Sequence, residues 1–243
     1  MSTISQPATV PEFSTPAVRG GVPPLVNGDR LTRVEFERRY HAMPHVKKAE
    51  LIEGVVYTPS PVCNKHARPH FDIITWLGTY CVATPGVAGG DNGTLRLDLD
   101  NEPQPDAFLR ILASHGGQAR VDADGYITGA PELVAEIAVS SVSIDLHAKL
   151  NVYRRNGVRE YIVWRVEDGA IDWFALRDGR YEPLLPTTGG VLSSEVFPGL
   201  WLDPATLLRG DMATVASVAQ AGTTSPEHAT FVERLRNAAT TGA

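Results

Sequence analysis

The sequence predicts an α/β protein, and the prediction rests on a unit of strand, helix and strand near the middle of the chain. The apolar run from Leu133 to Val139 has the length and the branched residues of a strand buried on both faces. Ser143 is suited to cap a helix of about three turns, which Asn156-Gly157 would end. A second strand is expected from Glu160 to Arg165.

One acid, Glu136, interrupts the apolar run of the first strand. A buried charge needs a partner, so Glu136 is either a structural carboxylate held by another group or a ligand of a divalent cation. Asp145 and Lys149 follow on the predicted helix, four residues apart with the acid first, which makes them neighbours near its start. The residues alone leave both interpretations of Glu136 open.

The elements before this unit are expected to be a helix and a hairpin. Thr32 is suited to cap a helix that ends near Pro44. Residues 49–57 have the pattern of a hairpin that turns at Glu53-Gly54. Glu50 lies in this hairpin, where it is either an exposed carboxylate or a further acid of a site.

A longer amphipathic helix is predicted from His66 to Ala83, with Pro69 in its first turn. His66 and His70 are four residues apart, but Pro69 lies between them and no third histidine or cysteine ligand is near, which disfavours zinc. We therefore expect a packed or phosphate-facing histidine.

Two further strands are expected before the central unit. The alternation in residues 94–100 predicts a half-buried strand with Leu95, Leu97 and Leu99 on one face. Another strand is expected to begin after Pro105. Asp106 at its start is a second candidate ligand.

After the central unit, residues 170–185 are expected to form a hairpin that turns at Asp178-Gly179. Residues 196–208 supply apolar side chains that would close a domain over residues 29–209. Residues 1–28 are rich in Pro, Ser, Thr and Gly and are expected to be disordered. Residues 210–243 are expected to be a flexible tail with one short helix starting at Ser225-Pro226.

Composition limits the classes of protein to which the chain can belong. At 243 residues, with 43% hydrophobic and 21% charged residues, it can form one sizeable core. No apolar run approaches the roughly 20 residues of a membrane span, and the N-terminus lacks the features of a secretory signal, so we expect a cytoplasmic protein. The net charge of −6 disfavours broad coating of nucleic acid but leaves a local site open.

Asp106, Glu136 and Lys149 together form a set of two acids and a lysine. Such a set can hold Mg²⁺ or Mn²⁺ between its carboxylates and activate a water, while the ammonium stabilises charge on a phosphate.

A longer series of residues makes this interpretation more specific. In chain order, the series is Glu50-Leu51-Ile52-Glu53-Gly54, His70, Ile73, Leu77, Pro105-Asp106, Pro131-Glu132-Leu133, Glu136-Ile137, Asp145, Lys149, Tyr153, Gly157-Val158 and Glu160-Tyr161. With this series, the chain from about Leu31 to Leu208 resembles the Uma2 family of restriction-endonuclease-like proteins, within the PD-(D/E)XK nuclease superfamily.

The resemblance implies a restriction-endonuclease-like core, in which a central mixed sheet is flanked by helices. It implies a metal-dependent endonuclease that hydrolyses phosphodiester bonds in DNA with Mg²⁺ or Mn²⁺. Asp106 and Glu136 take the metal-binding acid positions, and Glu50 is the additional acid of the family. The superfamily pattern has a lysine two residues after the second acid, where this chain has Ala138, so Lys149 would reach in from the helix.

The resemblance also suggests contacts with the substrate and a second copy. His70 fits the histidine of the family better than His66 does, and we expect it to contact substrate. Arg154 and Arg155 are candidates for contacts with the DNA backbone. A homodimer is expected because many endonucleases cut two strands as dimers.

Two other functions stay open. The first is a catalytically degenerate module on the same fold that binds nucleic acid or protein, which Ala138 and the acidic net charge motivate. The second, a pair of carboxylates acting on a glycoside, fits less well because the four tryptophans are scattered along the chain.

Overall fold

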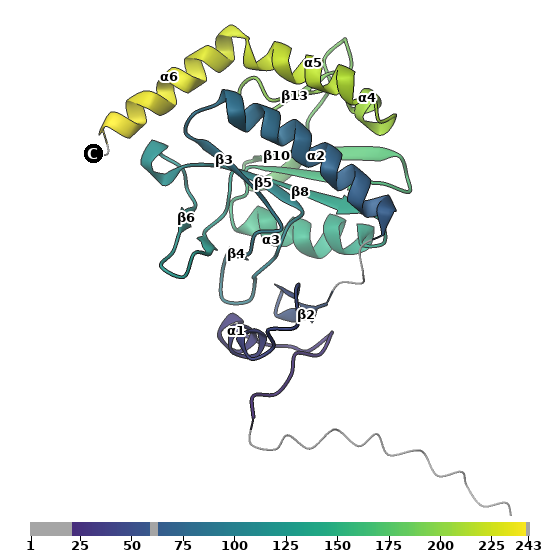
Figure 1. Ribbon diagram of the computed structural model, residues 1–243, viewed down its shortest axis with the longest axis vertical. Helices are drawn as coiled ribbons and strands as arrows, with labels where there is room; N and C mark the ends of the chain where they lie inside the picture. The colour runs from purple at the N-terminus through teal and green to yellow at the C-terminus, as the bar shows by residue number, and fades with distance from the viewer. Residues whose placement is uncertain (1–20, 59–62, 242–243) are drawn as a thin grey trace, which may run out of the picture.

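The computed structural model describes residues 21–58 and 63–241, and a six-stranded mixed sheet lies at its centre (Figure 1). Its strands are β3 (Val87–Asp91), β5 (Ala107–Ile111), β8 (Leu133–Ala138), β9 (Glu160–Arg165), β10 (Ala170–Arg177) and β11 (Arg180–Pro183). They lie in the order β11-β10-β9-β8-β5-β3, and β8 and β9 are the parallel pair. All six residues of β8 are buried, as expected for a strand covered on both faces.

Helices cover both faces of this sheet (Figure 1). On one face lies α2 (Asn64–Ala83), whose Trp76 packs edge-on against Trp173 of β10 with ring centroids 5.6 Å apart. On the other face lie the π-helical turn η2 (Ile144–Lys149) and α3 (Leu150–Arg155). Tyr153 of α3 stacks obliquely on Tyr161 of β9 at 5.0 Å. This arrangement confirms the fold class expected from the sequence, a mixed sheet flanked by helices.

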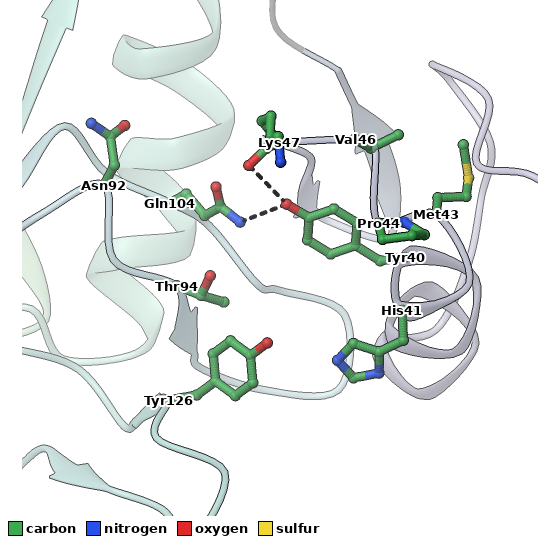
Figure 2. Close-up of a pocket in the computed structure, with 10 residues that line it drawn as sticks. All are labelled: Tyr40, His41, Met43, Pro44, Val46, Lys47, Asn92, Thr94, Gln104 and Tyr126. Carbon is green, nitrogen blue, oxygen red and sulfur yellow. Dashed lines mark hydrogen bonds between the residues drawn. The ribbon is translucent and has the colours of Figure 1, made fainter.

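A smaller N-terminal unit packs beside the sheet. It contains α1 (Arg33–His41), β1 (Glu50–Ile52) and β2 (Val55–Tyr57) around a cluster that includes Phe36 and Leu51. The β1–β2 turn has positive φ at Glu53 (52°) and Gly54 (72°), as predicted for the hairpin. Between this unit and the segment after β3 lies a groove, shown in Figure 2.

Short elements complete the chain. They are β4 (Leu95–Arg96), η1 (Ala113–His115), β6 (Arg120–Val121), β7 (Ile127–Thr128), β12 (Leu192–Ser193), β13 (Trp201–Leu202) and α4 (Pro204–Leu208). The long strand expected over residues 94–100 is wrong, because only β4 forms there and Leu99 is 73% exposed. Asp98 ends the extended stretch by accepting hydrogen bonds from the backbone of Asp100 and the side chain of Asn101.

The C-terminal residues differ from the flexible tail that the sequence suggests. They form α5 (Met212–Thr223) and α6 (Pro226–Thr241), and Val215 of α5 and Phe231 of α6 are buried in the main core. His228 lies 2.9 Å from the hydroxyl of Thr84 at the end of α2. A boundary at residue 209 would therefore divide one continuous core.

Three other expectations need adjustment. Thr32 precedes α1 in extended conformation, but its side chain makes no capping hydrogen bond. α2 begins at Asn64, which places Pro69 in the second turn. Of the N-terminal segment expected to be disordered, residues 1–20 lie outside the described residues, while Leu25 is buried against the N-terminal unit. No helix in the described part of the chain combines the length and apolar character that a membrane span requires.

Candidate active site

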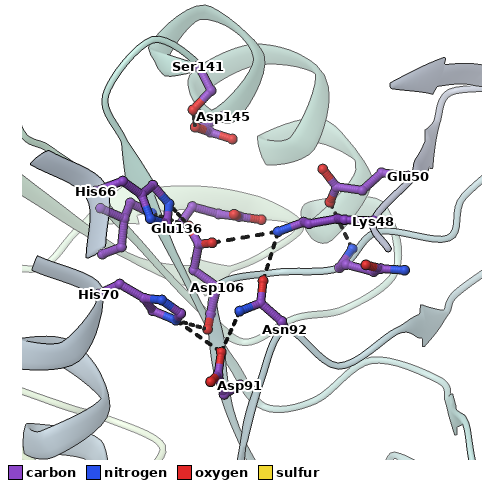
Figure 3. Close-up of polar contacts among 12 residues, drawn as sticks. Lys48, Glu50, His66, His70, Asp91, Asn92, Asp106, Glu136, Ser141 and Asp145 are labelled. Atoms are coloured by element: carbon purple, nitrogen blue, oxygen red, sulfur yellow. Dashed lines mark hydrogen bonds and ion pairs between the residues drawn. The ribbon is translucent and has the colours of Figure 1, made fainter. Parts of the chain in front are cut away.

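Asp106 and Glu136 meet at one edge of the central sheet (Figure 3). The antiparallel register pairs Ala107 of β5 with Ala135 of β8, so the residue before one and the residue after the other lie side by side. The backbone N–H of Ile137 donates a 2.8 Å hydrogen bond to Asp106 Oδ2. Asp106 is 4% exposed and Glu136 is 2% exposed, so both carboxylates are held by protein groups.

Lys149 lies among three carboxylates, of which Glu136 is one. Its Nζ is 3.0 Å from Glu50 Oε1, 3.0 Å from Glu136 Oε1 and 3.8 Å from Asp145 Oδ1. Tyr153 also donates a 2.7 Å hydrogen bond to Glu136 Oε1. The fold thus brings together acids from β1, β8 and η2 around one buried ammonium group.

The start of the helix that carries Lys149 explains its position. Ser143, the expected N-cap, has helical φ and ψ angles and makes no side-chain capping hydrogen bond. The hydroxyl of Ser141 donates a 2.5 Å hydrogen bond to Asp145 Oδ2, and its carbonyl accepts the backbone N–H of Asp145 at 2.9 Å. The π-helical turn that follows is a geometry often found at functional sites.

Three cationic or imidazole side chains line the more open side of Asp106 (Figure 3). His66 Nε2 lies 3.2 Å from Asp106 Oδ2, and Lys48 Nζ lies 3.7 Å from Asp106 Oδ1. His70 Nε2 lies 2.7 Å from the backbone oxygen of Asp106 and 3.1 Å from Asp91. The sequence analysis preferred His70 to His66, which is one turn away on α2, and it did not select Lys48, which is two residues before Glu50.

The pKa values of Asp106 and Glu136, the two acids at the sheet edge, are shifted in opposite directions. Burial alone would raise the pKa of Asp106, but the hydrogen bond to His66 and the charge of Lys48 lower it to about 2. Burial raises the pKa of Glu136, and Asp145 and the other nearby carboxylates add to that shift while Lys149 opposes it. Asp106 is therefore the ionised acid, whereas Glu136 holds a proton more readily.

The donor chemistry of this cluster suits a hard divalent cation. Carboxylate oxygens are the ligands that Mg²⁺ and Mn²⁺ prefer. The acids are Asp106, Glu136, Glu50 and Asp145, and the lysines among them are Lys48 and Lys149, which leaves an excess of negative charge. Within residues 21–58 and 63–241, no three His, Cys, Asp or Glu side chains are already arranged to hold a metal. Side-chain rotation would have to accompany binding.

The two arginines considered for DNA contacts lie outside this cluster. Arg154 donates a 3.0 Å hydrogen bond to the carbonyl of Gly179, and Arg155 pairs with Glu53 at 2.7 Å. Their role in binding DNA stays a prediction.

Comparisons with known proteins place these residues in context. A family model described as "Uma2: Putative restriction endonuclease" matches residues 34–205. A solved structure from Anabaena variabilis, titled as a putative nuclease belonging to DUF820, is similar with a TM-score of 0.48 and 12% sequence identity, over 74% of this chain and 97% of that chain. No curated protein matches the chain. The family match includes the acids and lysines of the cluster and ends before α5.

Proposed function

This chain belongs to the Uma2 family, and from that membership and its site we propose that it is a metal-dependent endonuclease that hydrolyses phosphodiester bonds in DNA. The single observation that carries the proposal is that Asp106 lies at one sheet edge beside Glu136, which shares Lys149 with Glu50. Burying several carboxylates costs folding free energy unless cations compensate their charge, and such clusters are typical of functional sites.

Asp106 and Glu136 are the residues that would hold Mg²⁺ or Mn²⁺, with Glu50 assisting. When bound, such a cation supplies positive charge that polarises the phosphate and acidifies water. Hydrolysis forms a bond from water oxygen to phosphorus, breaks a bond from phosphorus to one nucleoside oxygen, and leaves that oxygen to take up a proton. His66 holds Asp106 in place through its Nε2 contact at 3.2 Å.

We assign the phosphate contact to Lys48 rather than to Lys149. The side chain of Lys149 is 7% exposed and contacts three carboxylates, so it serves to hold the acids together. Lys48 is 25% exposed and lies beside Asp106 on the open side. Its ammonium is placed to stabilise charge that develops on a phosphate bound there.

The alternative function is a catalytically degenerate module that binds nucleic acid or protein. Ala138 occupies the usual lysine position and is fully buried. Because alanine carries no ammonium group, β8 supplies none to the site. The module would bind without a metal, and alanine at Asp106 or Glu136 would leave its binding intact.

The test is cleavage of supercoiled plasmid and single-stranded DNA with Mg²⁺ or Mn²⁺, by the wild type and by Asp106→Ala and Glu136→Ala. Glu227→Ala is a matched control, because Glu227 is an exposed acid in α6. We expect metal-dependent cleavage that both site variants lose and the control keeps. No cleavage together with no metal binding by calorimetry would favour the degenerate module.

A further inference from the structure

A groove with a volume of about 390 Å³ lies between the N-terminal unit and the segment after β3 (Figure 2). Its lining residues that matter here are Tyr40, His41, Asn92, Gln104 and Tyr126. Volumes of this size are typical of pockets for small organic groups. The groove is thus large enough for a ring system and has aromatic and amide side chains in its walls.

Two residues belong to both the groove and the site. The backbone N–H of Gln104 donates a 2.8 Å hydrogen bond to Glu50 Oε1, while the side chain of Gln104 lines the groove. Asn92 also lines the groove, and its Oδ1 lies 3.0 Å from the Nζ of Lys48, the lysine beside Asp106. The wall between groove and site is therefore one residue thick.

The ring of Tyr126 is held on one face. The guanidinium of Arg96 lies 4.2 Å from the centroid of this ring. Arg96 is itself held by ion pairs to Glu37 at 3.0 Å and to Asp122 at 2.8 Å. A ring held in this way loses little freedom when a flat partner stacks on it, and nucleobases stack on aromatic side chains regardless of sequence.

Gln104 adds hydrogen-bonding capacity to the groove. The residue is 5% exposed, and its Nε2 lies 3.4 Å from the hydroxyl of Tyr40. Among the described residues, its carboxamide oxygen has no hydrogen-bond partner. A glutamine carboxamide can offer one donor and one acceptor to the edge of a base.

We propose that this groove binds an unstacked nucleobase of the DNA whose phosphate lies at Asp106 and Lys48. The inference rests on the proposed function and specifies its substrate, which would be single-stranded DNA or a duplex with an unpaired nucleotide at the cleaved position. A base in a matched duplex would first have to leave its stack, which costs free energy. Tyr126 would provide the stacking surface and Gln104 the polar contact.

The first test measures binding by fluorescence anisotropy in the Glu136→Gln background, with Mg²⁺ present, so that the probe is not cut. The probes are a labelled thymidine oligonucleotide and an abasic oligonucleotide of the same length. We expect the thymidine probe to bind roughly tenfold more tightly, and Tyr126→Ala to remove that difference by weakening the thymidine probe alone. Tyr126→Phe, which keeps the ring, should restore it.

Phe71→Ala is the matched control, because Phe71 is an aromatic residue on α2 that is 68% exposed and does not line the groove. Equal affinity for the two probes, undetectable binding of both, or equal weakening of both by Tyr126→Ala would overturn the proposal. Thermal unfolding of each variant verifies that it is folded.

A second test separates this inference from the proposed endonuclease. Wild-type protein is given single-stranded DNA, matched duplex and duplex with one unpaired nucleotide. Faster cleavage of the first and third substrates supports the groove, whereas equal rates on all three contradict it and leave the endonuclease standing. If no substrate is cut but the probes are still discriminated, the groove stands and the endonuclease fails.

Discussion

At the scale of single residues, the two lysines of the site have different surroundings, so replacing each of them should change the stability of the protein by a different amount. Lys149→Met leaves Glu50 and Glu136 buried without their shared cation, so we expect a loss of about 3–5 kcal/mol in the free energy of unfolding. Lys48→Met removes a partly exposed ammonium, and we expect less than about 1 kcal/mol of destabilisation.

Cleavage activity should reveal the role of Lys48, whose replacement costs little stability. If Lys48 contacts the phosphate, Lys48→Met should reduce cleavage by roughly 10²-fold while the protein stays folded. Urea unfolding and plasmid cleavage on the same preparations measure both quantities. Normal activity of the Lys48→Met protein would show that another cationic group, and not Lys48, contacts the phosphate.

Glu102 gives a prediction for pH dependence. Burial, followed by its contact with Glu37, raises the pKa of Glu102 to about 8. The folded state therefore binds this proton more tightly than the unfolded state, so stability is greatest below about pH 4.5 and falls as pH rises towards about 8. We expect Glu102→Gln, which resembles the protonated acid, to exceed the wild type at pH 8.5 by on the order of 3 kcal/mol.

The measurement for Glu102 is urea unfolding of both proteins between pH 5 and pH 9. Wild type and Glu102→Gln should have similar free energies of unfolding at pH 5 and diverge as pH rises. Two curves that run parallel over the whole range would show that Glu102 does not titrate in this window.

Sequence reasoning reached some residues of the cluster and not others, for a physical reason. Asp106 and Glu136 stand out because each is an acid within or beside an apolar strand. Lys48 and His66 carry no such local contrast, and their contact with Asp106 depends on how β1 and α2 pack against β5. Contacts of that kind are set by tertiary structure.

At the scale of elements, hairpins and buried strands were predictable because their signals are local. Asp178-Gly179 has positive φ at both positions and forms the β10–β11 turn, as the sequence indicates. The C-terminal helices were harder, because their small residues give a weak apolar pattern. Gly222 of α5 packs so closely on Gly199 that its role appears only once the two segments meet.

This contact provides a prediction for α5. A methyl group added at Gly222 would lie 2.2 Å from the carbonyl oxygen of Gly199, so Gly222→Ala should destabilise the protein by about 1–3 kcal/mol. Gly78→Ala in α2 is the matched control, because beyond the neighbouring residues and the backbone of its own helix no atom lies within 4 Å of the added methyl group. The control should stabilise the protein by roughly 0.5–1 kcal/mol, since alanine favours helix.

Urea unfolding of both variants decides the question. If Gly222→Ala were as stable as the wild type, α5 would not be part of the cooperative core. Destabilisation by Gly222→Ala together with stabilisation by Gly78→Ala would instead support an α5 that unfolds together with the sheet.

At the scale of the whole molecule, the acids of the candidate site come from separate parts of the chain. Glu50 belongs to the N-terminal hairpin, Asp106 immediately precedes β5, and Glu136 lies within β8. A cation held by these residues would bind the folded chain and not the unfolded one. Metal binding should therefore stabilise the whole fold, and not only one loop.

The corresponding prediction is a rise in Tm with Mg²⁺ or Mn²⁺ concentration. At a free metal concentration of about 100 times Kd, linkage gives about 2.7 kcal/mol of added stability, which is roughly 5–10 °C in Tm for a chain of this size. The variant Asp106→Asn/Glu136→Gln keeps the shape of both side chains and should lose the shift, whereas Glu227→Gln should keep it. Because the comparison uses the shift and not the absolute Tm, any change in stability that the substitutions cause without metal cancels. An equal shift in all three proteins would place the metal away from Asp106 and Glu136, and would remove the basis for a metal-dependent reaction at this site.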